Sequence, residues 1–149
     1  MPLDLPDLLK MEKEELDELF RQSPAGELPD GDADGIVLVK PGTEISGVAS
    51  KIIHLAAWRG KVFRRTKGDL KNKILPFGIK AVRAKVYKDP SWFDGKETIV
   101  LDYSKTSFLA RKVRDEIREV SPGVYLGLVF WERDKIALFA LKFAQIRTS

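Results

Sequence analysis

Cysteine is missing from this 149-residue sequence, and histidine occurs once, as His54. Without cysteine the chain can form no disulfide bond, no reactive thiolate and no cysteine-based zinc site. With one histidine it cannot build a metal site from several histidines, and we expect a structural role for His54 over a catalytic one. We therefore predict neither a metal centre nor a cofactor.

Long apolar runs are missing too, since none approaches the roughly 20 residues that a membrane-spanning helix requires. The first residues are acidic, whereas a secretory signal peptide starts with bases followed by an apolar stretch. The G-x-G-x-x-G, P-loop and G-x-S-x-G patterns of nucleotide sites and serine nucleophiles do not occur. These absences predict a cytoplasmic protein that uses neither a bound nucleotide nor a serine triad.

Charge is distributed unevenly along the chain. Residues 1–35 hold eleven acids and three bases, whereas residues 36–149 hold 23 bases and 11 acids. An acidic arm on a basic body favours docking of one on the other, although two independently solvated faces would give the same pattern. We predict an acidic N-terminal helix and wrapping loop over residues 1–35, followed by a single domain over residues 36–149.

Hydrophobic periodicity predicts the elements. Apolar residues at helical spacing predict helices over 4–22, 43–57 and 108–120, the last from Leu109, Val113 and Ile117. A loop is expected over 23–35. Strands are expected over 36–39, 61–66, 70–75, 79–87, 98–103, 124–131 and 136–143, mostly joined by tight turns.

About seven strands linked as hairpins indicate an antiparallel sheet that curls or closes. Several strands are apolar on both faces, which predicts an interior on one side and a helical cover on the other. We predict an α+β fold: an antiparallel curved sheet or small β-barrel with two or three helices packed on it.

Residues 56–60, AAWRG, resemble the G-x-W-x-G signature of a family of small, poorly characterised bacterial proteins, with Ala56 in place of the first glycine. In that family the signature is followed by a D-Y segment, a helix of acids and bases and a late L-G pair. This chain has similar segments in the same order, namely Asp102-Tyr103, Arg114-Asp115-Glu116 and Leu126-Gly127. The resemblance covers about residues 35–130. It implies a lipocalin-like β-barrel and supplies no mechanism.

Polar side chains concentrate between residues 98 and 127. A carboxylate and a phenol at a strand end, facing guanidinium groups from the next helix, could bind an anionic group or place a general acid. The alternative is an exposed helix with charge pairs four residues apart. Together with two residues from the first half of the chain, the candidate ligand-binding residues are Trp58, Lys61, Asp102, Tyr103, Arg114 and Arg118.

Three functions fit these features. The expected one is binding of a small lipophilic molecule with an anionic or carbonyl end in a barrel pocket, by a protein that could also be a homodimer. A cofactor-independent isomerase, cyclase or hydrolase in the same pocket is the first alternative. The second is a module that binds nucleic acid or anionic lipid through the seven bases between Arg59 and Lys73, and nucleic acid is the less expected partner.

Overall fold

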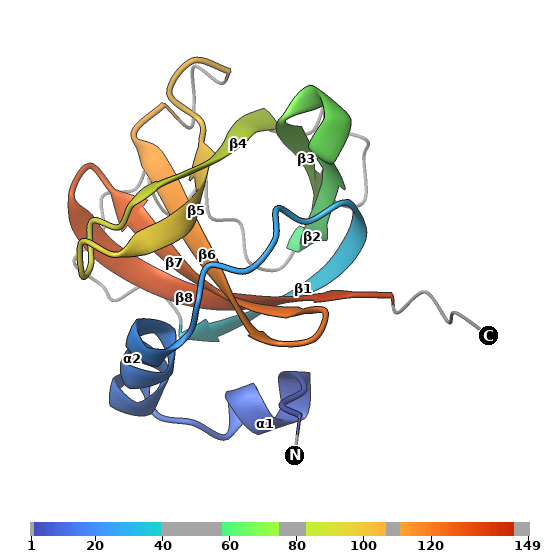
Figure 1. Cartoon of the computed structure of the whole chain (residues 1–149). Helices are drawn as coiled ribbons and strands as arrows, with labels where there is room; N and C mark the ends of the chain where they lie inside the picture. The colour runs from blue at the N-terminus through green and yellow to red at the C-terminus, as the bar shows by residue number, and fades with distance from the viewer. Residues whose placement is uncertain (1, 40–57, 75–82, 107–110, 145–149) are drawn as a thin grey trace.

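The computed structural model describes residues 2–39, 58–74, 83–106 and 111–144 (Figure 1). Eight strands form a closed antiparallel barrel in which each strand pairs with the next in sequence and β8 pairs with β1. The strands are β1 (Gly31–Val39), β2 (Trp58–Arg64), β3 (Asp69–Ile74), β4 (Arg83–Pro90), β5 (Glu97–Asp102), β6 (Val113–Ser121), β7 (Val124–Trp131) and β8 (Asp134–Phe143). The predicted antiparallel barrel is therefore confirmed.

Two short helices precede the barrel, α1 (Leu5–Leu9) and α2 (Lys13–Gln22), in place of the single helix predicted over 4–22. Asp4 starts α1, because its carboxylate accepts a hydrogen bond from the backbone N–H of Leu5 at 2.7 Å. The helical conformation is interrupted at Glu12, which has extended backbone angles and is the N-cap of α2. A 3-10 turn over Arg65–Lys67 joins β2 to β3.

The helix predicted over 108–120 is wrong, because Val113–Ser121 forms β6. Residues four apart share a face in a strand as well as in a helix, so Val113 and Ile117 point to the barrel interior in either case. Pairing with β5 on one side and β7 on the other overrides the local helical preference of the charged residues. The predicted helix over 43–57, with His54, lies outside the described residues.

Strand boundaries also differ from the prediction. The loop predicted over 23–35 ends earlier, since Gly31–Gly35 already belong to β1. The strand predicted over 79–87 is β4, which runs on to Pro90. The start of β1 was not predicted because its acidic residues are typical of a loop. In the structure Asp32 and Asp34 alternate with the buried Ala33 and so occupy outward positions of the strand.

The apolar residues form two clusters on opposite faces of the sheet. One lies inside the barrel and includes Ala33, Phe63, Leu70, Ala84, Ile99, Leu101, Ile117, Phe139 and Leu141. The other lies between the outer face of the sheet and the N-terminal helices and includes Leu8, Leu16, Phe20, Leu126, Leu128, Phe130, Leu138 and Ala140. Figure 1 shows α1 and α2 beside β7 and β8, which explains why these strands are apolar on both faces.

Residues 23–30 cross one end of the barrel, which we call the arm end; its rim consists of the turns β2–β3, β4–β5 and β6–β7 (Figure 1). The Tyr125 hydroxyl donates to the Glu27 carbonyl at 2.9 Å. The Arg65 side chain donates to the Leu28 carbonyl at 2.6 Å, and the Arg65 N–H donates to the Asp30 carboxylate. These contacts fix the arm across the rim. At the other end, the far end, β2, β4 and β6 begin.

Candidate functional site

Among the described residues, four hydrogen-bonded polar side chains converge inside the barrel: Lys61 of β2, Asn72 of β3, Tyr103 after β5 and Asp115 of β6. Lys61 is 3% exposed and Asp115 is 4% exposed. Strand alternation points them inward, because Lys61 is two residues from the interior Phe63. We call these four residues the interior polar cluster. Polar groups in so apolar an interior are costly unless they bond one another or a ligand.

The cluster is held together by short hydrogen bonds around the Lys61 side-chain nitrogen. Lys61 Nζ donates to Asn72 Oδ1 at 2.6 Å and to Tyr103 Oη at 2.7 Å. It also lies 3.2 Å from Asp115 Oδ2. Asn72 Nδ2 donates to Tyr103 Oη at 3.0 Å, and the Tyr103 hydroxyl donates to Asp115 Oδ2 at 3.2 Å. An amine, an amide, a phenol and a carboxyl group thus converge on one point.

One acceptor in the cluster has no partner among the described residues. Asp115 Oδ1 is buried and receives no hydrogen bond there, although Oδ2 of the same carboxyl group contacts both Lys61 and Tyr103. A buried oxygen without a donor costs roughly 1–3 kcal/mol. Asp115 Oδ1 can therefore accept a hydrogen bond from a ligand.

Burial shifts the pKa values of the three titratable members. It lowers the pKa of Lys61, although the nearby Asp115 charge opposes that change. It raises the pKa of Asp115, against the effect of Lys61. It raises the pKa of Tyr103 well above the usual phenol range, and the charge of Asp115 adds to that rise. Burial therefore favours the neutral forms of the amine and of the carboxyl group alike.

Aromatic rings form the walls beside the amine. Lys61 Nζ lies 5.4 Å from the ring centre of Phe139 and 5.4 Å from that of Tyr103. The Phe139 ring occupies the space above Gly127, where an added Cβ would lie 2.2 Å from Phe139 Cζ. Gly127 therefore allows the ring to lie across the interior, where it shields the amine from water.

The structure brings together two of the six predicted site residues, Lys61 and Tyr103. Trp58 starts β2, three residues before Lys61, and its side chain lies outside the described part of the structure. Asp102 lies on the outer face, since it alternates with the inward Tyr103. It accepts hydrogen bonds from the Tyr87 hydroxyl at 2.8 Å and from Ser104. Asp102 is thus separated from the interior by the barrel wall.

Arg114 also lies on the outer face. It is the cross-strand neighbour of Asp102 in the β5–β6 pairing, as expected for a pair at a strand end. Its guanidinium group lies 3.1 Å from the Glu116 carboxylate and stacks on the Trp92 ring, 4.2 Å from its centre. The predicted role of Arg114 beside Tyr103 has no support in this geometry.

Arg118 is fully buried, but between the barrel and α2 rather than inside the barrel. Its two terminal nitrogens donate to the two oxygens of Asp94 at 2.6 and 2.7 Å. One of them also donates to the Phe20 carbonyl at 2.8 Å. Because Phe20 belongs to α2 and Asp94 to the β4–β5 turn, Arg118 joins the N-terminal helix to the barrel wall. Its role is structural.

Asn72 and Asp115 are the two members of the cluster that sequence reasoning left out of the candidate set. The signal for Asp115 is visible once residues 113–117 are treated as a strand: it stands between Val113 and Ile117 on the apolar face. Asn72 likewise shares the inward face of β3 with Leu70. A polar residue at an inward position of an apolar strand indicates a partner inside.

The basic segment from Arg59 to Lys73 is the β2–β3 hairpin. Lys61 points into the barrel. Arg64 pairs with Asp69, with Nε 2.7 Å from Oδ1, and Arg65 binds the arm at Leu28 and Asp30. Three of the bases that suggested a nucleic-acid or lipid surface are therefore engaged within the protein.

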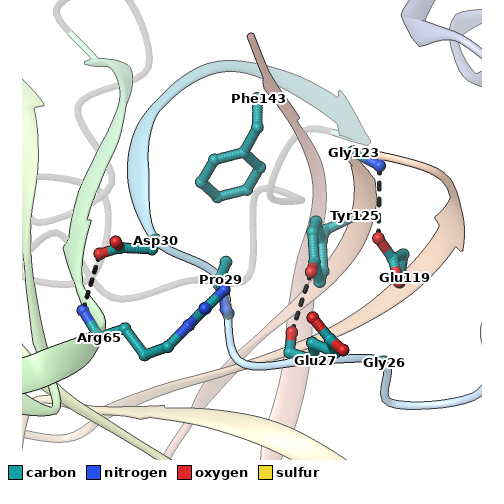
Figure 2. Close-up of a pocket in the computed structure, with 9 residues that line it drawn as sticks. All are labelled: Gly26, Glu27, Pro29, Asp30, Arg65, Glu119, Gly123, Tyr125 and Phe143. Atoms are coloured by element: carbon teal, nitrogen blue, oxygen red, sulfur yellow. Dashed lines mark hydrogen bonds between the residues drawn. The ribbon is translucent and has the colours of Figure 1, made fainter. Parts of the chain in front are cut away.

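A cleft of about 430 Å³ lies at the arm end, between the arm and the barrel rim. Figure 2 shows its lining residues: Gly26, Glu27, Pro29, Asp30, Arg65, Glu119, Gly123, Tyr125 and Phe143. The Phe143 ring at this cleft lies 5.5 Å from that of Phe63 in a tilted contact and 5.4 Å from that of Tyr125 in an edge-to-face contact, centre to centre. Its polar groups bond mostly one another, as the dashed lines in Figure 2 show.

Two features are absent from the described residues. No group of three or more acidic or histidine side chains is placed to hold a metal ion within the described ranges. In the same part of the chain no helix has both the length and the apolar character needed to cross a membrane.

Comparisons with known proteins show the fold class and nothing more specific. No protein-family model matches the sequence, and no curated protein matches it. A solved structure described as a crystal structure of a protein from Thermomonospora curvata has a similar fold, with a TM-score of 0.58 and 14% sequence identity. The match covers 91% of this chain and 89% of the other. The chain is thus an eight-stranded antiparallel β-barrel protein, and the resemblance to the G-x-W-x-G family has no support from sequence comparison.

Proposed function

We propose that the protein binds a small lipophilic molecule inside the barrel, with the anionic or carbonyl end of that molecule at the interior polar cluster. The observation that carries the proposal is the convergence of Lys61, Asn72, Tyr103 and Asp115 in an interior that is otherwise apolar. Binding sites for small molecules have this composition, with apolar walls and a few polar groups that fix one end of the ligand. Barrels of eight strands are wide enough to hold one small ligand.

The donors of the cluster suit an oxygen-bearing group. Lys61 offers an ammonium group, Tyr103 a hydroxyl and Asn72 an amide N–H₂, and each can turn from its present partner to a ligand oxygen. The carboxyl group of Asp115 is the present acidic partner of the Lys61 nitrogen, with Oδ2 at 3.2 Å. A carboxylate or carbonyl ligand would take over part of this role, and the apolar remainder of the ligand would lie against rings such as that of Phe139.

Titration with 11-(dansylamino)undecanoic acid, a fluorescent lipophile with a carboxylate end, tests the proposal. The expected result is a saturable rise and blue shift of dansyl emission, with affinity reduced about tenfold in Tyr103→Phe, the loss expected for one charge-assisted hydrogen bond. Arg133→Met, on the outer surface beside Trp92, is the matched control and should bind like wild type. Absence of binding, or equal affinity in a folded Tyr103→Phe variant, would refute the proposal.

A further inference from the structure

We infer that Lys61 forms an imine with an aldehyde ligand in the barrel, with Asp115 moving the protons. The inference rests on the proposed function and names the class of ligand for the same site: a lipophilic aldehyde, held as a reversible covalent adduct. The observation that carries it is the position of the buried Lys61 amine beside the carboxyl group of Asp115. Oδ2 of that group lies 3.2 Å from the amine nitrogen, and Oδ1 has no hydrogen-bond partner among the described residues.

The amine is positioned as a nucleophile would be. The three hydrogen-bonding contacts of Lys61, with Asn72, Tyr103 and Asp115, fix its nitrogen in one place. The Phe139 ring excludes water on one side. Imines hydrolyse in water, so a site that retains one must be dry. Nucleophilic lysines in proteins are those that burial keeps in the neutral form, and burial acts on Lys61 in that direction.

The step balances without an oxidant or a reductant. The lone pair of the neutral Nζ attacks the aldehyde carbon while the C=O π electrons move to oxygen, and that oxygen takes the proton of the neutral Asp115 carboxyl group to give a carbinolamine. The nitrogen loses a proton to Asp115 Oδ2, which is 3.2 Å away. The carbinolamine hydroxyl then leaves as water after taking a proton from the same carboxyl group, and the nitrogen lone pair forms the C=N bond. One protonated imine, the Asp115 carboxylate and one water are produced, and the reverse sequence releases the aldehyde.

Asp115 Oδ1 is the atom that can bond the carbinolamine hydroxyl. The carbinolamine hydroxyl needs a hydrogen-bond acceptor as it forms and a proton as it leaves. Oδ1 is buried in the interior and has no hydrogen-bond partner among the described residues, whereas Oδ2 contacts the Lys61 amine nitrogen. One carboxyl group can therefore serve the nitrogen through one oxygen and the departing hydroxyl through the other. After dehydration the carboxylate neutralises a protonated imine.

Exposed lysines provide an internal comparison within the same molecule. The side chains of Lys112 and Lys142 are 47% and 43% exposed, whereas that of Lys61 is 4% exposed. An aldehyde that partitions into the barrel meets Lys61 at high local concentration in a dry site. Modification should therefore be selective for Lys61.

The experiment is reductive trapping on the full chain with cinnamaldehyde as the probe and sodium cyanoborohydride as the reductant at pH 7. The expected result is one adduct per chain, with a mass gain equal to the aldehyde less one oxygen atom, located by peptide mapping on Lys61. In Asp115→Asn, which keeps the amine, the trapping rate should fall roughly 100-fold. 11-(Dansylamino)undecanoic acid should protect Lys61 by competition.

The outcomes separate the two proposals. If the dansyl lipophile binds but the adduct is absent from Lys61, or is spread over Lys112 and Lys142 to the same extent, the imine inference fails and the binding proposal stands. If the dansyl lipophile does not bind, the binding proposal fails, and the imine inference that rests on it fails with it. Unchanged trapping in a folded Asp115→Asn variant, checked by its thermal unfolding, would overturn the proton-moving role of Asp115.

Discussion

The side-chain nitrogen of Lys61 and the phenol oxygen of Tyr103 lie 2.7 Å apart, although 42 residues separate them in sequence. Lys61 belongs to β2 and Tyr103 follows β5, so β3 and β4 stand between them along the barrel wall. Their contact crosses the interior and exists because the sheet is closed. The interior polar cluster is therefore a product of the barrel as a whole, and its loss should be detectable in stability as well as in binding.

The Lys61–Asp115 pair should show strong coupling in a double-mutant cycle. Lys61→Met leaves a buried carboxyl group without its cationic partner, and we expect a loss of about 3 kcal/mol in the free energy of unfolding. The double variant Lys61→Met/Asp115→Leu should recover most of this loss, because an apolar pair has no unbalanced charge. Urea unfolding measures both. Losses that simply add would show that the two side chains do not interact.

Arg118 should be essential for attachment of the N-terminal helices. Arg118→Met removes its bonds to Asp94 and to the Phe20 carbonyl, and we expect a loss of about 3 kcal/mol in the free energy of unfolding. Limited trypsin digestion should then cleave faster within α2. Arg21→Met is the matched control, since Arg21 is half exposed and pairs with Glu18 on the surface; it should change stability by less than about 1 kcal/mol. Equal effects of the two substitutions would contradict the role given to Arg118.

The Asp94–Arg118 contact should make stability depend on acid pH. The hydrogen bond from Arg118 holds the pKa of Asp94 below its usual value in the folded protein. Its stabilising contribution is therefore complete above the unfolded pKa of about 3.9 and is lost as pH falls through the lower folded value. The stability difference between wild type and Asp94→Asn should be largest at pH 7 and shrink below pH ~4.

Thermal unfolding of both proteins from pH 7 to pH 2 measures this difference. The matched control is Glu132→Gln, which breaks the exposed pair between Lys112 and Glu132. That variant should stay within about 0.5 kcal/mol of wild type throughout. A wild-type advantage over Asp94→Asn that persists unchanged at pH 2 would contradict the prediction.

Gly127→Ala should displace the Phe139 ring. An added Cβ would lie 2.2 Å from Phe139 Cζ, so the ring must move, and overpacking of this kind costs roughly 1–3 kcal/mol. Because Phe139 also lies beside Lys61, binding of the dansyl lipophile should weaken in the same variant. Gly95→Ala is a contrasting control: its Cβ would meet no atom within 4 Å, and its cost would come only from its positive φ of 75°. Wild-type binding in Gly127→Ala would contradict this role of Phe139.

The sequence predicts the barrel well because the hydrophobic pattern of its strands has a period of two residues and because residues typical of tight turns separate the strands. Val124–Trp131 and Asp134–Phe143 are apolar on both faces, and the structure places the interior on one side and the N-terminal helices on the other. The error at Val113–Ser121 has a physical cause, since residues 113 and 117 share a face in either geometry. Only the neighbouring strands decide between helix and strand there.

The candidate site could be predicted only in part. Lys61 and Tyr103 were both among the predicted ligand-binding residues, but their contact depends on barrel closure and register, which no local pattern encodes. Arg114 and Arg118 were grouped with them because a helix would have brought them near Tyr103. On a strand the same two arginines face outward, where Arg118 joins α2 to the wall.

A crystal structure of the protein with decanoate tests the central claim most directly, because it locates a lipophilic anion without any variant. The account predicts the carboxylate inside the barrel, within hydrogen-bond distance of Lys61 Nζ and Tyr103 Oη, with the alkyl chain along the apolar interior. Decanoate in the cleft beside Phe143, or at surface positions alone, with the interior polar cluster unchanged, would contradict it.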